Sequence, residues 1–146
     1  MATNTGISAD PLDIGELHRW VKDDHAGAVV TFSGITRDSV DGKPVRQLSY
    51  DCYKPRAEQT LHAIAEGSLS IFPGTKKVAI YHRVGVVPLG EDSVIIAVSA
   101  AHRGEAWKAG EWILEEIKAT AEIWKREVFT DGTSEWVNSS VPRREH

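Results

Sequence analysis

Lys118 and Lys125 are two amines whose spacing could direct them into one pocket. They lie seven residues apart in "EIKATAEIWKRE" (116–127), about 700° of helical rotation, so an unbroken helix would project both from nearly the same side. Glutamates, including Glu122, alternate with them at steps of three and four, which is typical of a solvated helix face. A lysine becomes a useful catalytic group only where burial or nearby cations favour its neutral amine. The spacing therefore leaves both interpretations open.

Three other polar residues could bind an anion. His102 and Arg103 follow an apolar segment and directly precede a predicted helix, where free backbone N–H groups and the helix dipole favour negative charge. Arg37 follows the predicted strand "GAVVTFSG" and is a second, loop-borne cation. The alternative is that His102 is a core residue and that both arginines are ordinary surface residues.

Other chemistries find little support in the motifs. The six histidines are scattered without metal-ligand spacing, and phosphate-loop, dinucleotide-binding and GxSxG motifs do not occur. Cys52 lies within a predicted strand and is interpreted as a packing residue. These patterns favour neither a metal site nor a serine or cysteine nucleophile.

Composition indicates one soluble domain. The chain has 146 residues, 41% of them hydrophobic, with a net charge of −4, which argues against coating nucleic acid or an anionic membrane. No segment approaches the ~20 apolar residues of a membrane span. With no secretory signal and one cysteine, we expect a cytoplasmic protein.

The elements that must position these residues can be predicted from periodicity and turn signals. We expect flexible ends at 1–9 and 139–146, and one domain over 10–138. Its expected elements are a helix from Asp10 to about Lys22, strands over 27–34 and 45–53, a helix over 56–71, strands over 76–85 and 92–102, a long helix from Glu105 to about Lys125, and a hairpin over 126–138 that turns at Asp131 and Gly132. Strands joined locally by turns predict an α+β sandwich of two layers, with a mixed or antiparallel sheet and helices on one face.

Three blocks in this order, "GAVVTFSGITR", "YHRVGVVPLGEDSVIIAVSAAHR" and "IKATAEIWKRE", closely resemble the large, catalytic subunit of molybdopterin synthase, the MoaE-like family. The resemblance covers about residues 10 to 137. It implies an α/β hammerhead fold with a small additional antiparallel β subdomain.

The resemblance also implies an activity and its partners. The family is a sulfurtransferase that converts cyclic pyranopterin monophosphate into molybdopterin. The sulfur arrives as a thiocarboxylate on the C-terminal Gly-Gly of a small ubiquitin-like sulfur-carrier subunit. Two large subunits form a central homodimer within a heterotetramer, and the transfer step requires no metal or redox cofactor.

By the same resemblance, Lys118 and Lys125 are expected to be the catalytic lysines, with Lys118 beside the incoming thiocarboxylate. Arg37, His102 and Arg103 are expected to bind the substrate, and in this family the last two serve the lysines of the partner chain. The remaining expected contacts are Phe32 and Leu114 as pocket walls, and Ile35, Thr36, Arg126 and Glu127 as flanking residues.

The sequence departs from the family pattern at three places. Glu122 replaces a common proline, so we expect the long helix to continue further and to reorient Lys125. Trp107 replaces a common phenylalanine, which we interpret as a packing change. Arg143 or Arg144 could substitute for a family arginine near the C-terminus.

Two other classes of protein compete with the enzyme interpretation. A non-catalytic, dimeric α+β module that binds a small anionic ligand would use the arginines but turn Lys118 and Lys125 toward solvent beside Glu122. An RNA-binding sandwich would need a basic, aromatic sheet face, which the net charge of −4 disfavours.

Overall fold

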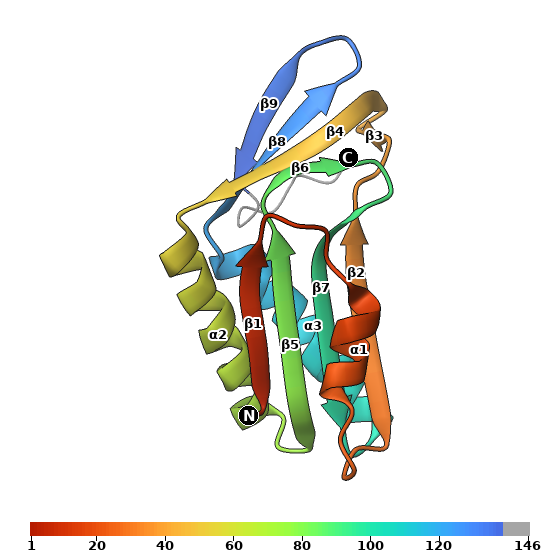
Figure 1. Ribbon diagram of the computed structural model, residues 1–146, viewed down its shortest axis with the longest axis vertical. Coiled ribbons are helices and arrows are strands. Elements are labelled where there is room, and N and C mark those ends of the chain that lie inside the picture. Colours follow the sequence, from red (N-terminus) through yellow and green to blue (C-terminus); the bar gives the residue numbers. More distant parts are fainter. Residues whose placement is uncertain (139–146) are drawn as a thin grey trace.

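Two sheets and three helices make up the protein in the computed structural model, which describes residues 1–138 (Figure 1). The expected tail over 139–146, with Arg143 and Arg144, lies outside the described residues. In chain order the elements are β1 (Thr3–Ser8), α1 (Ile14–Val21), β2 (Ala28–Ile35), β3 (Ser39–Val40), β4 (Lys43–Cys52), α2 (Lys54–Ile71), β5 (Thr75–Arg83), β6 (Gly85–Pro88), β7 (Asp92–Ala100), α3 (Arg103–Thr120), β8 (Ile123–Phe129) and β9 (Ser134–Asn138).

The first sheet has the strand order β1-β5-β7-β2 and is mixed, because β1 pairs with β5 in parallel while the other pairs are antiparallel. We expected residues 1–9 to be flexible, and that expectation is wrong: Thr3 to Ser8 pair with Val78 to Arg83. This segment is short and polar, so its sequence shows no strand pattern. Hydrogen bonds to β5 and the packing of α2 against it stabilise the strand.

Helices cover both faces of this sheet. Val78, Ile80, Ile96 and Val98 pack in the core under α2 and α3, whereas Ala79, Ile95 and Ala97 pack with Leu17 and Val21 of α1. Our placement of all helices on one face is therefore corrected for α1. Because helices cover both faces, side chains on either face of β7 are buried, which explains why β7 is apolar along nearly its whole length.

The second sheet is the small antiparallel subdomain, with the order β3-β4-β8-β9 and β6 paired to β4 (Figure 1). Asp41 and Gly42 both have positive φ in the turn from β3 to β4, as a two-residue hairpin loop requires. Gly132, at φ 88°, lies in the predicted turn from β8 to β9. The predicted α+β class with a mixed sheet and an extra antiparallel subdomain is confirmed.

The long helix ends earlier than predicted. α3 stops at Thr120, and Ala121 already has extended backbone angles, so Glu122 does not prolong the helix. Residues 123–129 instead form β8, in which Ile123 and Phe129 are buried by pairing with β4. The helical pattern that predicted a helix to about Lys125 does not hold here, because the tertiary gain from strand pairing overrides that local pattern.

Candidate functional site

Lys125 lies on β8 and not on a helix, so the prediction that both lysines share one helix face is wrong. Exposure alternates along β8: Ile123, Glu127 and Phe129 are buried, while Trp124 and Arg126 are exposed. Since strand side chains alternate between faces, half-buried Lys125 points to the same inner face as Glu127. The Cα atoms of Lys125 and the buried Glu127, two residues apart on β8, therefore lie about 7 Å apart.

Lys118 lies in the last turn of α3, where its side chain is exposed. Only Ala121 and Glu122 connect α3 to β8. Two helical steps and five extended ones allow the Cα atoms of Lys118 and Lys125 to be at most about 23 Å apart. Glu122, expected between the two lysines, forms an ion pair with Arg56 of α2 at 3.3 Å. The lysines thus share the junction between α3 and the second sheet.

Arg37 belongs to the same end of the first sheet as Lys118. Gly110 of α3 lies beside Val30 of β2, where an added Cβ would be 3.6 Å from the valine Cγ1 atom. β2 runs antiparallel to β7, and α3 turns back along β7 and β2, so α3 and β2 run in the same direction. Arg37 follows β2 and is exposed. The carboxyl ends of both elements, with Lys118 and Arg37, therefore lie at one end of the sheet.

The predicted pocket walls occupy the face between β2 and α3. Phe32 pairs with Ile96, and paired residues of antiparallel strands share a face, so Phe32 lies on the α3 side. It is 37% exposed, and Leu114 of α3 packs at the edge of the core on the same side. Ile35 is exposed at the end of β2, next to this face.

Thr36 and Glu127 are buried, which does not suit their predicted contact with substrate. Thr36 is 3% exposed and its hydroxyl donates to the Val87 carbonyl at 3.4 Å. Glu127 is fully buried, and Arg126 points to the opposite face, where it donates to Ser134 at 3.0 Å. Thr36 and Glu127 can therefore hold neighbouring site residues in place from inside the fold. Of these three residues, only Arg126 presents its polar group to solvent.

His102 and Arg103 lie at the other end of α3 from Lys118. Arg103 begins the helix, and fifteen residues at 1.5 Å each separate it from Lys118 by about 22 Å. This helix start is fixed by the turn before β5: the Gly74 amide donates to the Glu105 carboxylate at 2.8 Å, and the Ala101 amide donates to the Gly74 carbonyl at 2.9 Å. Within one chain the structure therefore does not bring His102 and Arg103 together with the lysines.

A buried polar cluster that no sequence motif indicates lies beside Lys125. Tyr50 of β4 pairs with Lys125, and its ring meets the ring of His82 edge to face at 4.9 Å. Burial is the main cause that raises the pKa of Tyr50, and the Glu127 carboxylate raises it further, while a hydrogen bond with Ser93 opposes both. These residues come from four different strands, which is why no local motif could have identified them.

His82 gives the protein a predicted pH dependence of stability. Burial lowers its pKa from 6.5 to about 4, and a hydrogen bond from Nδ1 to the Arg83 carbonyl at 2.8 Å only partly opposes this. Above pH 6.5 both states are neutral. As the pH falls from 6.5 toward 4, the unfolded state binds a proton that the folded state does not, so stability is lost.

We expect this loss to reach about 2 kcal/mol at pH 5. Urea unfolding at pH 7.5 and pH 5 would measure it, with His82→Gln as the matched variant that keeps a donor but cannot titrate. Because carboxylates also titrate, the informative quantity is the difference between the two proteins. Equal pH dependence in both would contradict the assignment to His82.

A pocket of about 600 Å³ lies elsewhere, lined by residues of the turn after α1, the start of β2 and Lys77. None of the predicted site residues lines it. Its lining mixes Lys22 and Lys77 with Asp23 and Asp24, so it has no single sign of charge. We therefore place the candidate site at the junction of the two sheets and not in this pocket.

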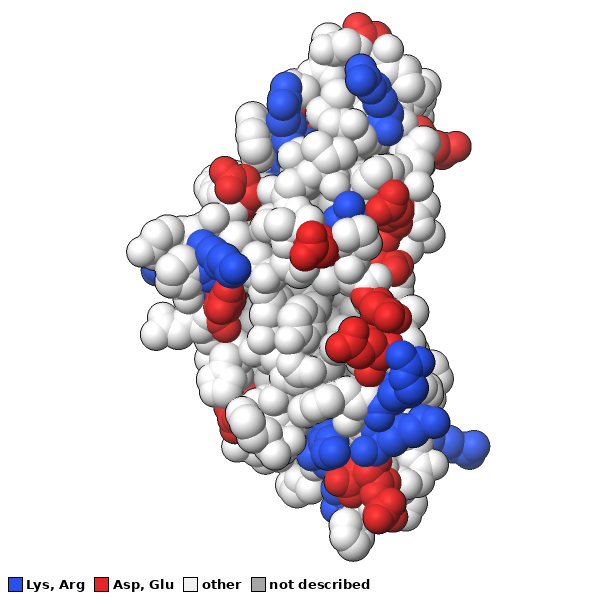
Figure 2. All heavy atoms as spheres, viewed as in Figure 1, with Lys and Arg blue, Asp and Glu red and all other residues white. Residues whose placement is uncertain are grey.

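Charges of both signs are mixed on the face of the molecule that Figure 2 shows. On the face in Figure 2, described Lys and Arg side chains are interspersed with Asp and Glu, and they gather mainly at the lower end beside acidic residues. Recognition of RNA or DNA needs a continuous basic surface. Among residues 1–138, no helix is long and apolar enough to cross a membrane.

The comparisons with known proteins agree with this fold. Residues 7–120 match the model of the MoaE protein family. The chain is 47% identical over 131 residues to the molybdopterin synthase catalytic subunit of Pyricularia oryzae, covering 90% of this chain and 71% of that one. A molybdopterin synthase structure from Staphylococcus aureus superimposes with a TM-score of 0.86 at 34% identity, covering 91% of this chain and 96% of that chain.

A complex of subunits 1 and 2 of molybdopterin-converting factor from Helicobacter pylori contains a chain of the same fold, with a TM-score of 0.72 over 92% of this chain and 88% of that one. At 22% identity this likeness concerns the fold alone. The mixed α+β fold with its antiparallel subdomain is the fold of these molybdopterin synthase structures. The chain belongs to the MoaE family.

Proposed function

We propose that this chain is the catalytic subunit of a molybdopterin synthase and acts as a sulfurtransferase in molybdenum cofactor biosynthesis. Its substrate is cyclic pyranopterin monophosphate, and its sulfur donor is the thiocarboxylated C-terminus of a small ubiquitin-like subunit. The observation that supports this best is the match of residues 7–120 to the MoaE family, together with the position of Lys118, Lys125 and Arg37 at one end of the fold.

The chemistry assigned to the lysines is proton transfer and charge stabilisation. The thiocarboxylate sulfur forms a bond to a pterin carbon, a substrate oxygen leaves with protons, and water then cleaves the acyl–sulfur bond to release the tail as a carboxylate. Lys118 and Lys125 can donate protons to the departing oxygen, and their positive charge stabilises the anion that develops. Two such transfers supply both sulfurs of the product.

The substrate's phosphate requires cations near these lysines. Arg37 supplies one from the same chain, and a guanidinium can bind a phosphate through two hydrogen bonds. His102 and Arg103, about 22 Å along α3 from Lys118, can contribute only if a second copy of the chain brings its own helix start to this site. The proposed unit is therefore a homodimer with one small subunit at each site. A cytoplasmic location remains our expectation, in keeping with the free thiol of Cys52.

A reconstituted assay tests the proposal. The protein is mixed with the thiocarboxylated small subunit and cyclic pyranopterin monophosphate, and dithiolene product is followed by mass spectrometry. The matched control uses the same small subunit with an ordinary C-terminal carboxylate, which cannot give sulfur. Absence of product from a correctly assembled complex would favour the non-catalytic anion-binding module, in which exposed Lys118 is part of a solvated surface.

A further inference from the structure

The segment that carries Arg37 is fixed by the turn between β6 and β7. At Gly34 and Ile35 the pairing of β2 with β7 shifts register, so the regular ladder ends before Arg37. Beyond that point the Thr36 amide donates to the Glu91 carbonyl at 3.2 Å, and the Gly90 amide donates to the Thr36 carbonyl at 3.0 Å. Both backbone groups of the residue before Arg37 are therefore bound by one turn.

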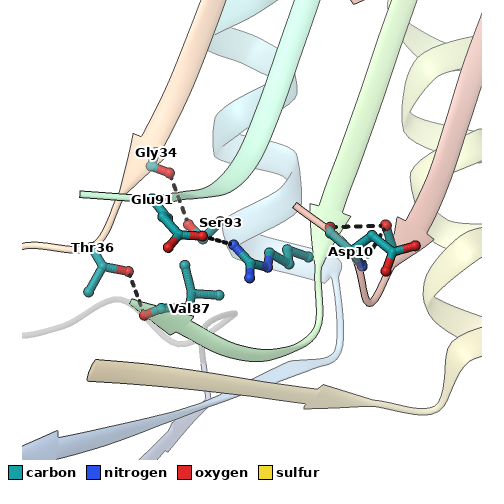
Figure 3. Close-up of polar contacts among 8 residues, drawn as sticks. Asp10, Gly34, Thr36, Val87, Glu91 and Ser93 are labelled. Atoms are coloured by element: carbon teal, nitrogen blue, oxygen red, sulfur yellow. Dashed lines mark hydrogen bonds and ion pairs between the residues drawn. The ribbon is translucent and has the colours of Figure 1, made fainter. Parts of the chain in front are cut away.

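That turn is itself held by an ion pair with Arg83 at the end of β5. The Arg83 Nη1 atom lies 2.7 Å from Glu91 Oε1. Figure 3 shows Glu91 near Thr36 and Val87. Arg83 is only 8% exposed, and its Nε atom has no hydrogen-bond partner among residues 1–138. The contact with Glu91 is thus what compensates a nearly desolvated charge.

The approach to the segment is fixed as well. The Ser93 hydroxyl donates to the Gly34 carbonyl at 3.1 Å (Figure 3). The Ser33 hydroxyl donates to Asp92 at 2.6 Å. These contacts orient the end of β2, whereas the Glu91 contacts orient the residue beyond it. The ion pair between Arg83 and Glu91 accordingly holds the turn that binds the residue directly before Arg37.

We propose that Arg83 is a positioning residue for substrate binding, which acts through Glu91 to hold Thr36 and hence Arg37. This inference rests on the proposed function, because it assigns Arg37 to the substrate's phosphate. Arg83 is nearly buried and Glu91 is half-exposed, and such an ion pair adds little net stability compared with apolar side chains of the same volume. A role in fixing one loop geometry therefore explains its position better than stability alone.

Kinetics of three variants tests the proposal in the reconstituted assay. In Arg83→Met and in Glu91→Gln we expect KM for cyclic pyranopterin monophosphate to rise roughly tenfold, with kcat within about twofold, because a loosened binding group costs substrate affinity in ground and transition states alike. Arg83→Lys, which keeps the charge, should recover part of the loss. Arg19→Met, the same change on exposed α1, should match wild type.

Amide hydrogen exchange supplies a readout that does not depend on activity. Thr36 and Gly90 should exchange at least about tenfold faster in Glu91→Gln, a variant of a half-exposed residue that leaves the core intact. An unchanged KM in both variants, or unchanged exchange at Thr36 and Gly90, would overturn the inference even if wild type is active. A wild-type protein without activity, but with the expected exchange, would instead count against the proposed function.

Discussion

Lys118→Ala is expected to lower product formation by at least about 100-fold while leaving the protein folded. General acid catalysis and charge stabilisation each contribute on the order of 10² or more, and Lys118 is assigned both. The side chain is exposed at the end of α3, and alanine is the best helix former, so the substitution removes an amine without opening the core. Single-turnover formation of dithiolene product measures the effect.

Lys108→Ala is the matched control, since Lys108 is also exposed on α3 but lies ten residues nearer its start. It should retain wild-type turnover. Lys125→Ala should also lose activity, and its unfolding must be measured alongside, because Lys125 is half-buried and shares a face with the buried Glu127. Wild-type rates of product formation in a folded Lys118→Ala protein would contradict the catalytic role assigned to Lys118.

Two inactive variants are expected to restore activity to each other when they are produced together. Lys118→Ala leaves the helix start intact, and the double variant His102→Ala, Arg103→Ala leaves the lysines intact. If each site combines the lysines of one chain with the helix start of its partner, random pairing makes half of the dimers mixed. Each mixed dimer has one undamaged site, so about one quarter of wild-type activity should return.

The basis for this expectation is the length of α3, because about 22 Å of rigid helix separates Arg103 from Lys118. The measurement uses differently tagged chains, purified as the mixed dimer, at a substrate concentration below the KM of the double variant; in this purified dimer, with one intact site of two, about half of wild-type activity is expected. Each variant produced alone is the control. No recovery in the mixed dimer would mean that His102 and Arg103 do not serve the partner's lysines.

Several features were determined by the sequence alone. The apolar run of β7, the helical period of α2 and the Asp131–Gly132 turn predicted their elements, because each signal is local and agrees with its tertiary setting. Lys118, Arg37 and the helix start at Arg103 could also be identified as candidates, since exposed cations at element ends are visible in the order of residues. The resemblance then connected them to one activity.

Tertiary structure decided the rest. The polar segment Thr3–Ser8 became a strand only through pairing with β5, and residues 123–129 left the helical pattern because pairing with β4 buries Ile123 and Phe129. That change moved Lys125 from a helix face to a sheet face beside Tyr50 and Glu127. The pair of Arg83 and Glu91 likewise depends on the contact between the end of β5 and the turn before β7. Contacts between distant strands leave no period in a sequence, so only the folded chain shows which groups support the site and which lie too far away to join it.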